Sequence, residues 1–275
     1  MSRRRVIILW GLGVALILTG CASRAEAPTG ASPTAGVTPG PVQADGEAVA
    51  SPAPSPSQTP QATSQPAVDH AVSVVIATAG GASVDVFDQP DGNVVTTVNA
   101  ADVLTNPTVT PLVFLVERVE DEWLLVYLPI RPNGSTGWVL AADVTLATTD
   151  MRVEVSLADF SLEVWHGEEL VFQAPVAVGR SDRPTPGGVY YIRELVQPAD
   201  PDGVYGPYAY GLSGFSQVLD SFGGGDAVIG LHGTNEPDSI GTTVSSGCLR
   251  MLNEDLITLV TEVGLSLGTP VYLSE

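Results

Sequence analysis

One histidine and one cysteine in the C-terminal part of the 275-residue chain could do chemistry together. His232 stands in "IGLHGT", and Cys248 stands in "VSSGCLRM" sixteen residues further on. A thiol with its ordinary pKa of about 8.5 needs a base or a lowered pKa to react at neutral pH. A histidine, whose ordinary pKa is about 6.5, is suited to accept that proton. The pair therefore predicts a nucleophilic Cys248 with His232 as its base.

The residues around Cys248 favour an accessible thiol. Gly247 lets the backbone approach a ligand closely, and the segment "NEDLITLVTEVG" that follows predicts a helix. Asn253 is expected to cap this helix and Gly264 to end it, so that the helix start could favour a thiolate at Cys248. Two alternatives remain for Cys248. It could form an intermolecular disulfide, as an unpaired cysteine of an exported protein can, or it could be a buried, unreactive side chain.

The other candidate side chains are weaker. His70 ends a polar segment and His166 lies in a predicted hairpin tip, so neither is expected to be catalytic. One cysteine and one histidine do not make a ligand set for a metal ion, and we expect neither a metal nor a cofactor. The chain contains no lysine and has a formal net charge of −20, which argues against nucleic acid as a partner.

Residues 1–21, "MSRRRVIILWGLGVALILTGC", have the layout of a secretory signal. The apolar run at residues 6–18 is short for a membrane-spanning helix, which needs about 20 residues. The run ends in Leu18-Thr19-Gly20-Cys21, which resembles the bacterial lipobox, and the resemblance implies lipidation of Cys21. The alternative is an ordinary signal or N-terminal anchor. Both readings place the protein in the cell envelope; a lipid anchor would hold it on the outer face of the cytoplasmic membrane.

Two folded regions are expected after a tether. Residues 22–71 are rich in Ala, Pro, Ser and Thr and predict a disordered segment, which would hold the folded part away from the membrane. Residues 72–147 alternate apolar and polar positions between turn signals, which predicts about five short strands in a small β-barrel. This region resembles bacterial Src-homology-type barrels with a "GWV" strand near their end. It could bind or orient at the cell wall, or it could be a packing domain without a ligand of its own.

Residues 150–275 predict a second, mainly β region with one or two helices. "MRVEVSLADFSLEVWHGEELVFQAPVAVG" indicates two strands joined at His166-Gly167 and then a third, and "DAVIGLHGT" indicates a buried strand that ends at His232. "GTPVYL" predicts a last strand after the helix. The fold class expected for the whole chain is therefore mainly β, with the small barrel followed by this larger region.

These segments resemble the catalytic domain of the YkuD-type L,D-transpeptidases. The likeness lies in "HGT" and "SSGCLRM", in the opening hairpin "LEVWHGEELVFQAPVAVG", and in the "RPTPGGVYYI" strand. It implies a mixed β-sandwich catalytic domain over residues 150–275. The position before the Gly-Cys pair, often His in that family, is Ser246 here, which puts any role for a second histidine in doubt.

The resemblance also implies an activity and roles for residues. Cys248 would attack a peptidoglycan stem peptide, release D-alanine and form a thioester, and an amine of a second stem would then make a crosslink. His232 would be oriented by the Gly233 carbonyl. Donor and acceptor stem peptides would be the partners.

Further roles are expected around this pair. The backbone N–H groups of Gly247 and Cys248 are expected to form the oxyanion hole, next to Ser246. Tyr210 belongs to an aromatic stretch that could wall the substrate groove or simply pack within a strand. Arg250 is either a contact for a substrate carboxylate or a structural brace.

We considered three alternatives to a transpeptidase function. Hydrolysis by water would make the same domain an L,D-carboxypeptidase, and the sequence does not separate the two activities. A non-catalytic wall-binding lipoprotein is disfavoured by the intact His232 and Cys248 pair. A papain-like hydrolase is disfavoured because its cysteine precedes its histidine, which is the reverse of the order here.

Overall fold

The computed structural model describes residues 73–275. The predictions for the signal segment 1–21, the tether 22–71 and lipidation at Cys21 lie outside the described residues. The described part consists of strands with a few short helices, which confirms the mainly β fold class. None of its helices is long and apolar enough to cross a membrane.

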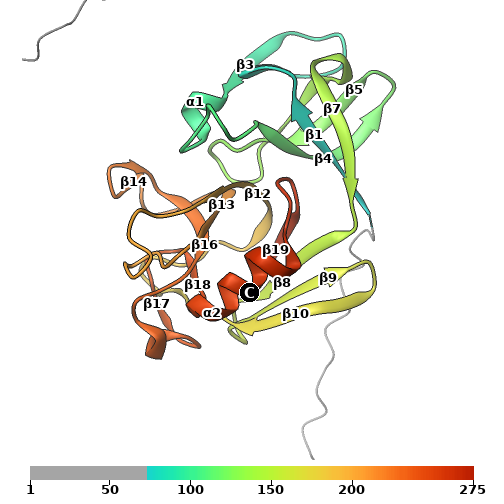
Figure 1. Cartoon of the computed structure of the whole chain (residues 1–275). Helices are drawn as coiled ribbons and strands as arrows, with labels where there is room; N and C mark the ends of the chain where they lie inside the picture. Colours follow the sequence, from blue (N-terminus) through green and yellow to red (C-terminus); the bar gives the residue numbers. More distant parts are fainter. Residues whose placement is uncertain (1–72) are drawn as a thin grey trace, which may run out of the picture. The chain divides into compact units, whose positions relative to one another are not determined.

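Seven strands between Val74 and Thr149 form one sheet, in the order β3-β2-β6-β5-β4-β1-β7. We expected about five strands, and the structure corrects that number. The Src-homology type of this region stays a prediction. The strands are β1 (Val74–Ala79), β2 (Ser83–Phe87), β3 (Val94–Asn99), β4 (Val113–Glu120), β5 (Trp123–Tyr127), β6 (Thr136–Leu140) and β7 (Val144–Thr149), with the short helices α1 (Ala100–Val103) and η1 (Ala141–Asp143) between them (Figure 1).

The alternating pattern of the first region explains its sheet. Val84 and Val86 of β2 are buried while Ser83 and Asp85 between them are exposed, as expected for a strand with one face on a core. Strands β4 and β5 form an antiparallel hairpin, with Asp121 at φ 50° in its turn. The first sheet therefore has its own apolar core, which includes the fully buried Phe114 and Leu124.

Eight strands of the second region form a mixed sheet, in the order β10-β9-β8-β19-β12-β13-β16-β18. Most neighbours are antiparallel, whereas β19 with β8 and β16 with β18 are parallel. The strands are β8 (Met151–Ser156), β9 (Ser161–His166), β10 (Glu169–Pro175), β12 (Gly188–Val196), β13 (Ala209–Phe215), β16 (Val228–His232), β18 (Leu249–Arg250) and β19 (Pro270–Ser274) (Figure 1). Short pairs are formed by β11 (Val178–Gly179) with β17 (Thr243–Ser245) and by β14 (Ser221–Phe222) with β15 (Gly225–Asp226).

The opening of the second region differs from the expectation in one detail. The turn at His166 and Gly167 is confirmed, with Gly167 at φ 60°. The stretch before it, however, is divided into β8 and β9 by a turn in which Phe160 adopts φ 55°. A phenylalanine is not a turn signal, but Ser156 and Asp159 are: the Asp159 N–H donates to Ser156 Oγ at 3.2 Å, and the Ser156 hydroxyl donates to Asp159 Oδ2 at 2.7 Å.

The predicted helix is present but begins differently. It consists of α2 (Asn253–Thr258) and a π-helical turn, η3 (Leu259–Val263), and it ends at Gly264 with φ 71°, as expected. Asn253 is its first helical residue and does not cap it; the N-cap position is Leu252, without a side-chain cap. The buried Leu256 and Leu259 attach the helix to the core of the second region. The short helix η2 (Pro237–Ser239) lies in the loop after β16.

A turn of the first region holds the end of β13. The side chain of Asn133 donates from Nδ2 to the Phe215 carbonyl at 2.8 Å and accepts at Oδ1 from the Phe215 N–H at 2.8 Å. Arg131 donates to the carbonyl oxygens of Ser216 at 2.7 Å and Leu219 at 2.9 Å. The first region therefore supplies hydrogen bonds that the backbone of the second region needs.

Candidate active site

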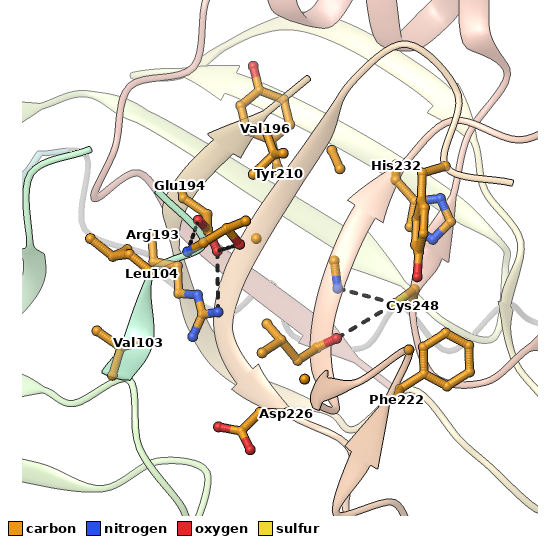
Figure 2. A pocket seen from close by; sticks show the side chains of 18 of the residues that line it. Val103, Leu104, Arg193, Glu194, Val196, Tyr210, Phe222, Asp226, His232 and Cys248 are labelled. Carbon is orange, nitrogen blue, oxygen red and sulfur yellow. Dashed lines mark hydrogen bonds and ion pairs between the residues drawn. The ribbon is translucent and has the colours of Figure 1, made fainter. Parts of the chain in front are cut away.

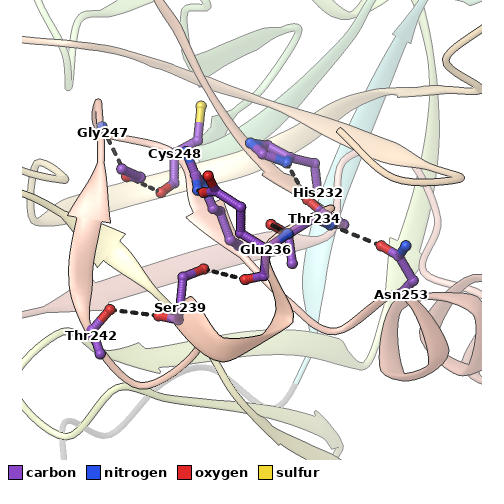
Figure 3. Close-up of polar contacts among 11 residues, drawn as sticks. His232, Thr234, Glu236, Ser239, Thr242, Gly247, Cys248 and Asn253 are labelled. Carbon is purple, nitrogen blue, oxygen red and sulfur yellow. Dashed lines mark hydrogen bonds and ion pairs between the residues drawn. The ribbon is translucent and has the colours of Figure 1, made fainter. Parts of the chain in front are cut away.

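The sheet brings His232 and Cys248 together. His232 is the last residue of β16, and Cys248 directly precedes β18. The two strands run parallel, with Leu231 opposite Leu249 and His232 opposite Arg250. Figure 3 shows the His232 ring and the Cys248 thiol next to each other on these neighbouring segments. The predicted juxtaposition of base and thiol is therefore present in the structure.

Gly230 leaves the space between the two side chains open. A Cβ atom at Gly230 would lie 3.2 Å from the Tyr210 carbonyl oxygen, 3.9 Å from His232 Cδ2 and 4.0 Å from Cys248 Sγ. His232 and Gly230 are two residues apart on β16 and so face the same side of the sheet. A larger residue at position 230 would occupy the volume in which thiol, imidazole and a bound carbonyl group must meet.

The hydrogen bond of the His232 ring fixes its tautomer. Nδ1 lies 2.7 Å from the Gly233 carbonyl oxygen, which can only accept, so Nδ1 carries the proton. In the neutral ring Nε2 then has a free lone pair and can accept the thiol proton. His232 is only 5% exposed, and burial lowers its pKa to about 4, although the bond to Gly233 opposes this shift. The ring is therefore neutral at pH 7.

The Cys248 thiol is half-buried and rests in its protonated form. Burial raises its pKa, while the Gly230 N–H, which donates to Sγ at 3.4 Å, and the charge of Arg250 act in the opposite direction. The expectation that a helix start would stabilise a thiolate here is wrong, because Cys248 leads into strand β18 and α2 begins only at Asn253. The resting pair is therefore a thiol beside a neutral imidazole.

Asn253 fixes the turn that carries the Gly233 carbonyl. Its Oδ1 accepts a hydrogen bond from the Thr234 N–H at 2.8 Å (Figure 3). A Cβ atom at Gly233 would lie only 2.2 Å from this oxygen, so glycine is required there. The same turn packs against Gly206, whose φ of 64° also favours glycine. Asn253 thus acts on His232 through Gly233.

Two cavities meet at the Cys–His pair. The larger has a volume of about 550 Å³ and the smaller of about 170 Å³, and His232 and Cys248 line both. Tyr205 and Phe222 also line both cavities. The Tyr205 ring meets the His232 ring edge to face, with centroids 5.0 Å apart. The thiol therefore borders both cavities; Figure 2 shows Cys248, His232 and Phe222 together at one side of a pocket.

One of the two expected oxyanion donors, the Gly247 N–H, already has a hydrogen-bond partner. The Gly247 N–H donates to Ser245 Oγ at 3.1 Å, and the Ser245 hydroxyl in turn donates to the Cys248 carbonyl at 2.6 Å (Figure 3). The Gly247 N–H is therefore engaged within its own turn in this structure. Gly247 itself is required, because its φ is 120° and a Cβ atom would lie 3.1 Å from Ile229 Cδ1.

The remaining predicted site residues surround the pair. Ser246 lines the smaller cavity and accepts a hydrogen bond from Arg183 Nη1 at 3.3 Å. Arg250 lines the same cavity and donates to Glu236 Oε2 at 2.8 Å, so it is braced while it also faces the site. Tyr210 is buried in β13 and lines the larger cavity (Figure 2). Within residues 73–275 no group of three or more His, Cys, Asp or Glu side chains is placed to hold a metal ion.

Several residues of the site were not singled out from the sequence. Gly230 and the role of Asn253 depend on contacts across strands, and no local pattern announces them. The segment Asp102–Thr105, from α1 and the loop after it, lines the larger cavity although it belongs to the first region. The one local hint of a role for Gly230 was its place inside the predicted strand "VIGLHG". The alternation of apolar and polar residues in a strand does not explain a glycine there.

Comparison with known proteins agrees with this arrangement. Residues 150–273 match the family model for YkuD, the L,D-transpeptidase catalytic domain. A putative L,D-transpeptidase YkuD of Bacillus licheniformis is 35% identical over 116 residues, which cover 42% of this chain and 62% of that protein. Its counterpart in Bacillus subtilis is 34% identical over the same length, with the same coverage. The chain spans about three fifths of the length of these relatives.

A solved structure with some similarity to this chain is L,D-transpeptidase 3 from Mycobacterium tuberculosis. It is 15% identical, with a TM-score of 0.37, and the match covers 53% of this chain and 77% of that one. The family resemblance drawn from "HGT" and "SSGCLRM" is confirmed over residues 150–273 by the family model.

Proposed function

We propose, on the premise that residues 150–273 form a catalytic domain of the YkuD family, that this protein is an L,D-transpeptidase of peptidoglycan. Cys248 would be its nucleophile and His232 its base. The substrates would be two stem peptides, one that donates an acyl group and one that supplies an amine.

The observation that supports transfer best is the meeting of two cavities at one thiol. The larger cavity, of about 550 Å³, has room for a peptide donor, whereas the smaller, of about 170 Å³, has room for an attacking side chain. Hydrolysis would need only one peptide site and access for water. Two sites that share His232 and Cys248 suit a reaction with two peptide substrates.

The first half of the reaction forms a thioester. His232 Nε2 accepts the Cys248 proton as Sγ attacks the carbonyl carbon between the third residue and the terminal D-alanine. The C–N bond breaks, and the proton on His232 passes to the departing amine, so D-alanine leaves neutral. The low pKa of His232 makes the imidazolium a strong acid, which favours this second transfer.

The second half returns the enzyme to its starting state. An amine of the acceptor stem, bound in the smaller cavity, attacks the thioester carbon while His232 takes its proton. The C–S bond breaks, a new amide bond links the two stems, and Cys248 recovers its proton. Water in place of the amine would release a tripeptide instead and make the protein a carboxypeptidase.

A location at the cell envelope fits this reaction. We propose that Cys21 carries the lipid and that the segment after it lets the catalytic part reach the wall. Replacing Cys21 with Ala should release the protein from the membrane fraction of cells, whereas retention of the variant in that fraction would reject the anchor.

Mass spectrometry of products from purified tetrapeptide stems tests the proposed activity. The purified protein should convert these stems into crosslinked dimers with release of D-alanine, and Cys248→Ala should form none. A tripeptide without any dimer would show trimming in place of transfer. Unchanged tetrapeptide with the wild-type protein would reject the proposed function.

A further inference from the structure

A short hairpin of the second region borders both cavities at the Cys–His pair. It consists of β14, β15 and the turn between them, and residues 221–226 are all exposed. Phe222 of this hairpin lines both cavities, and Figure 2 shows it next to Cys248. The two strands form a sheet of their own, apart from the eight-stranded sheet. Because an isolated two-stranded hairpin is only marginally stable, the position of Phe222 depends on how the hairpin is held where it leaves the fold.

The chain enters this hairpin through residues 215–219, which form its root. The Ser216 N–H donates to the Ala227 carbonyl at 2.8 Å and so closes the root across the two arms of the hairpin. Ser216 Oγ accepts from the N–H groups of Val218 at 3.3 Å and of Leu219 at 3.1 Å. These bonds engage N–H groups of the root. The carbonyl oxygens of Ser216 and Leu219 are bound by a side chain of the first region instead.

That side chain is Arg131, which lies in the turn between β5 and β6. Its Nη1 donates to the Ser216 carbonyl at 2.7 Å and its Nη2 donates to the Leu219 carbonyl at 2.9 Å. The guanidinium also lies over the Phe215 ring, 4.9 Å from its centroid. A guanidinium is planar and donates from atoms at a fixed spacing, so one side chain sets the distance between the two carbonyl groups of the root.

Fastening the two regions together does not account for these bonds. Asn133, in the same turn, already joins the first region to both backbone groups of Phe215, at 2.8 Å each. Arg131 is exposed, so it fills no space in a core. Its two hydrogen bonds lie further along the chain than those of Asn133, at the carbonyl groups that precede β14. Arg131 therefore acts on the path of the hairpin and Asn133 on the end of β13.

We propose that Arg131 of the first region is a positioning residue for the reaction: it holds the root of the hairpin and thereby keeps Phe222 at the two cavities. The proposal rests on the proposed function and deepens it. Arg131 touches neither the substrate nor Cys248 and acts through Ser216 and Leu219. The first region is then a working part of the catalytic unit, because it sets the shape of the substrate cavities from outside the second region.

The test compares Arg131→Ala with a matched variant, Arg118→Ala. Arg118 of β4 is also exposed and makes the same kinds of contact, but within the first region: an ion pair with Glu120 at 3.1 Å and a ring contact with Trp138, 5.1 Å from its centroid. Both variants remove one positive charge from the first region. They differ in whether the lost guanidinium bound the root of the hairpin.

Hydrogen exchange measured by mass spectrometry reports on the hairpin without any substrate. Loss of one charge-assisted hydrogen bond changes an equilibrium constant by roughly 10-fold or more. The amides of residues 216–227 should therefore exchange roughly 10-fold faster in Arg131→Ala than in the wild-type protein. Arg118→Ala should leave the exchange of this segment unchanged.

Steady-state kinetics with a tetrapeptide donor give the second readout. A hairpin that holds Phe222 in place for only part of the time lowers the apparent affinity by that fraction. Arg131→Ala should raise KM by roughly 3-fold to 10-fold, while kcat should change by less than about 2-fold because the Cys–His pair on β16 and β18 is left intact. Arg118→Ala should keep the wild-type KM.

A lysine at position 131 keeps the charge but presents one ammonium group in place of two donors at a fixed spacing. Arg131→Lys should therefore lie between the wild type and Arg131→Ala in both exchange and KM. If Arg131→Ala fails to fold, Arg131→Lys and Arg118→Lys carry the same comparison.

The outcomes distinguish the role of Arg131 from the proposed function. Wild-type exchange of residues 216–227 in Arg131→Ala, or the same KM in Arg131→Ala and Arg118→Ala, would overturn the positioning role and leave transpeptidation standing. A fall in kcat at an unchanged KM would overturn it as well. No turnover of the tetrapeptide by the wild-type protein would overturn the proposed function and, with it, the role of Arg131 in the reaction.

Discussion

The backbone N–H of Gly230 donates a hydrogen bond to the sulfur of Cys248 over 3.4 Å. This contact holds the thiol beside a strand position that has no side chain. It also directs a donor at the sulfur, which stabilises the thiolate that forms during the reaction. The site is therefore organised around a glycine that leaves room for the substrate carbonyl.

Replacing Gly230 with Ala should slow acylation of Cys248 while the fold persists. The added methyl group would press on the Tyr210 carbonyl oxygen at 3.2 Å, which the strand must accommodate by a small shift, and it would also contact His232 Cδ2 and Cys248 Sγ and fill the space in which the substrate carbonyl must sit. A misplaced reacting group costs about 100-fold in rate. Stopped reactions analysed by mass spectrometry give the acylation rate. Gly81→Ala, where a Cβ atom would meet only Ser83 O at 4.0 Å, is the matched control. Equal acylation rates in the two variants would contradict this role.

Replacing Asn253 with Ala should destabilise the protein and also lower kcat. The buried Thr234 N–H would lose its acceptor, at a cost of about 1–3 kcal/mol in the free energy of unfolding. The Gly233 carbonyl that orients His232 would lose its support. Urea unfolding and steady-state kinetics measure the two effects. Asn253→Asp keeps an acceptor oxygen and should recover most of the stability. If Asn253→Asp were as unstable as Asn253→Ala, the hydrogen bond would not be the cause.

The low pKa of His232 predicts how stability depends on pH. Above pH 6.5 the ring is neutral in both the folded and the unfolded chain. As the pH falls from 6.5 to about 4, the unfolded chain binds a proton that the folded one does not, so stability decreases by about 3 kcal/mol. Urea midpoints of the wild type and of His232→Gln, measured between pH 4 and 8, isolate this contribution from the carboxylates. The same pH dependence in both proteins would refute the shift.

The same pKa values predict the reactivity of the thiol. Because the pKa of Cys248 is raised, alkylation by iodoacetamide should keep increasing with pH through about 9 without a plateau. Enzymatic acylation should instead fall only as the pH drops toward 4, where His232 becomes protonated. A plateau of alkylation near pH 7 would indicate a preformed thiolate and contradict the neutral resting pair.

Asn133 of the first region should matter for the stability of the second. Its side chain satisfies both the N–H and the carbonyl of Phe215, which is buried at the end of β13. Asn133→Ala should lower the free energy of unfolding by about 2 kcal/mol, since two backbone groups lose their partners. Asn93→Ala, at an exposed position whose side chain makes no hydrogen bond to another described residue, is the control and should change stability by less than about 0.5 kcal/mol. Equal urea midpoints for both variants would exclude this link.

The features of the fold and of the site that depend on a few neighbouring residues were predictable from the sequence. The alternation in "SVDVF", the hairpin at Glu120–Trp123 and the glycine that ends the last helix each follow from a few neighbouring residues. His232 and Cys248 could be paired because a chain expected to be exported had a thiol without an evident disulfide partner and one well-placed base. Each of these predictions requires only the types of the residues and short distances between them along the sequence.

The parts that depend on distant contacts were not predictable. Asn253 has the residue type of a helix cap, yet its oxygen serves the Thr234 N–H nineteen positions earlier in the chain. Thr105 and Glu194 are 89 positions apart, and nothing in either segment signals that they join. The pKa of Cys248 was expected to be lowered by a helix, but the strand that follows it and the burial of the thiol reverse the direction.

The central claim is that Cys248 carries the acyl group of the donor stem. Intact-mass spectrometry of the purified protein, quenched with acid during turnover of a tetrapeptide donor, tests it most directly. The wild-type protein should gain the mass of the donor less D-alanine, fragmentation should place that mass on Cys248, and Cys248→Ala should gain nothing. An adduct on another residue, or product formation without any adduct while Cys248→Ala remains active, would contradict the account.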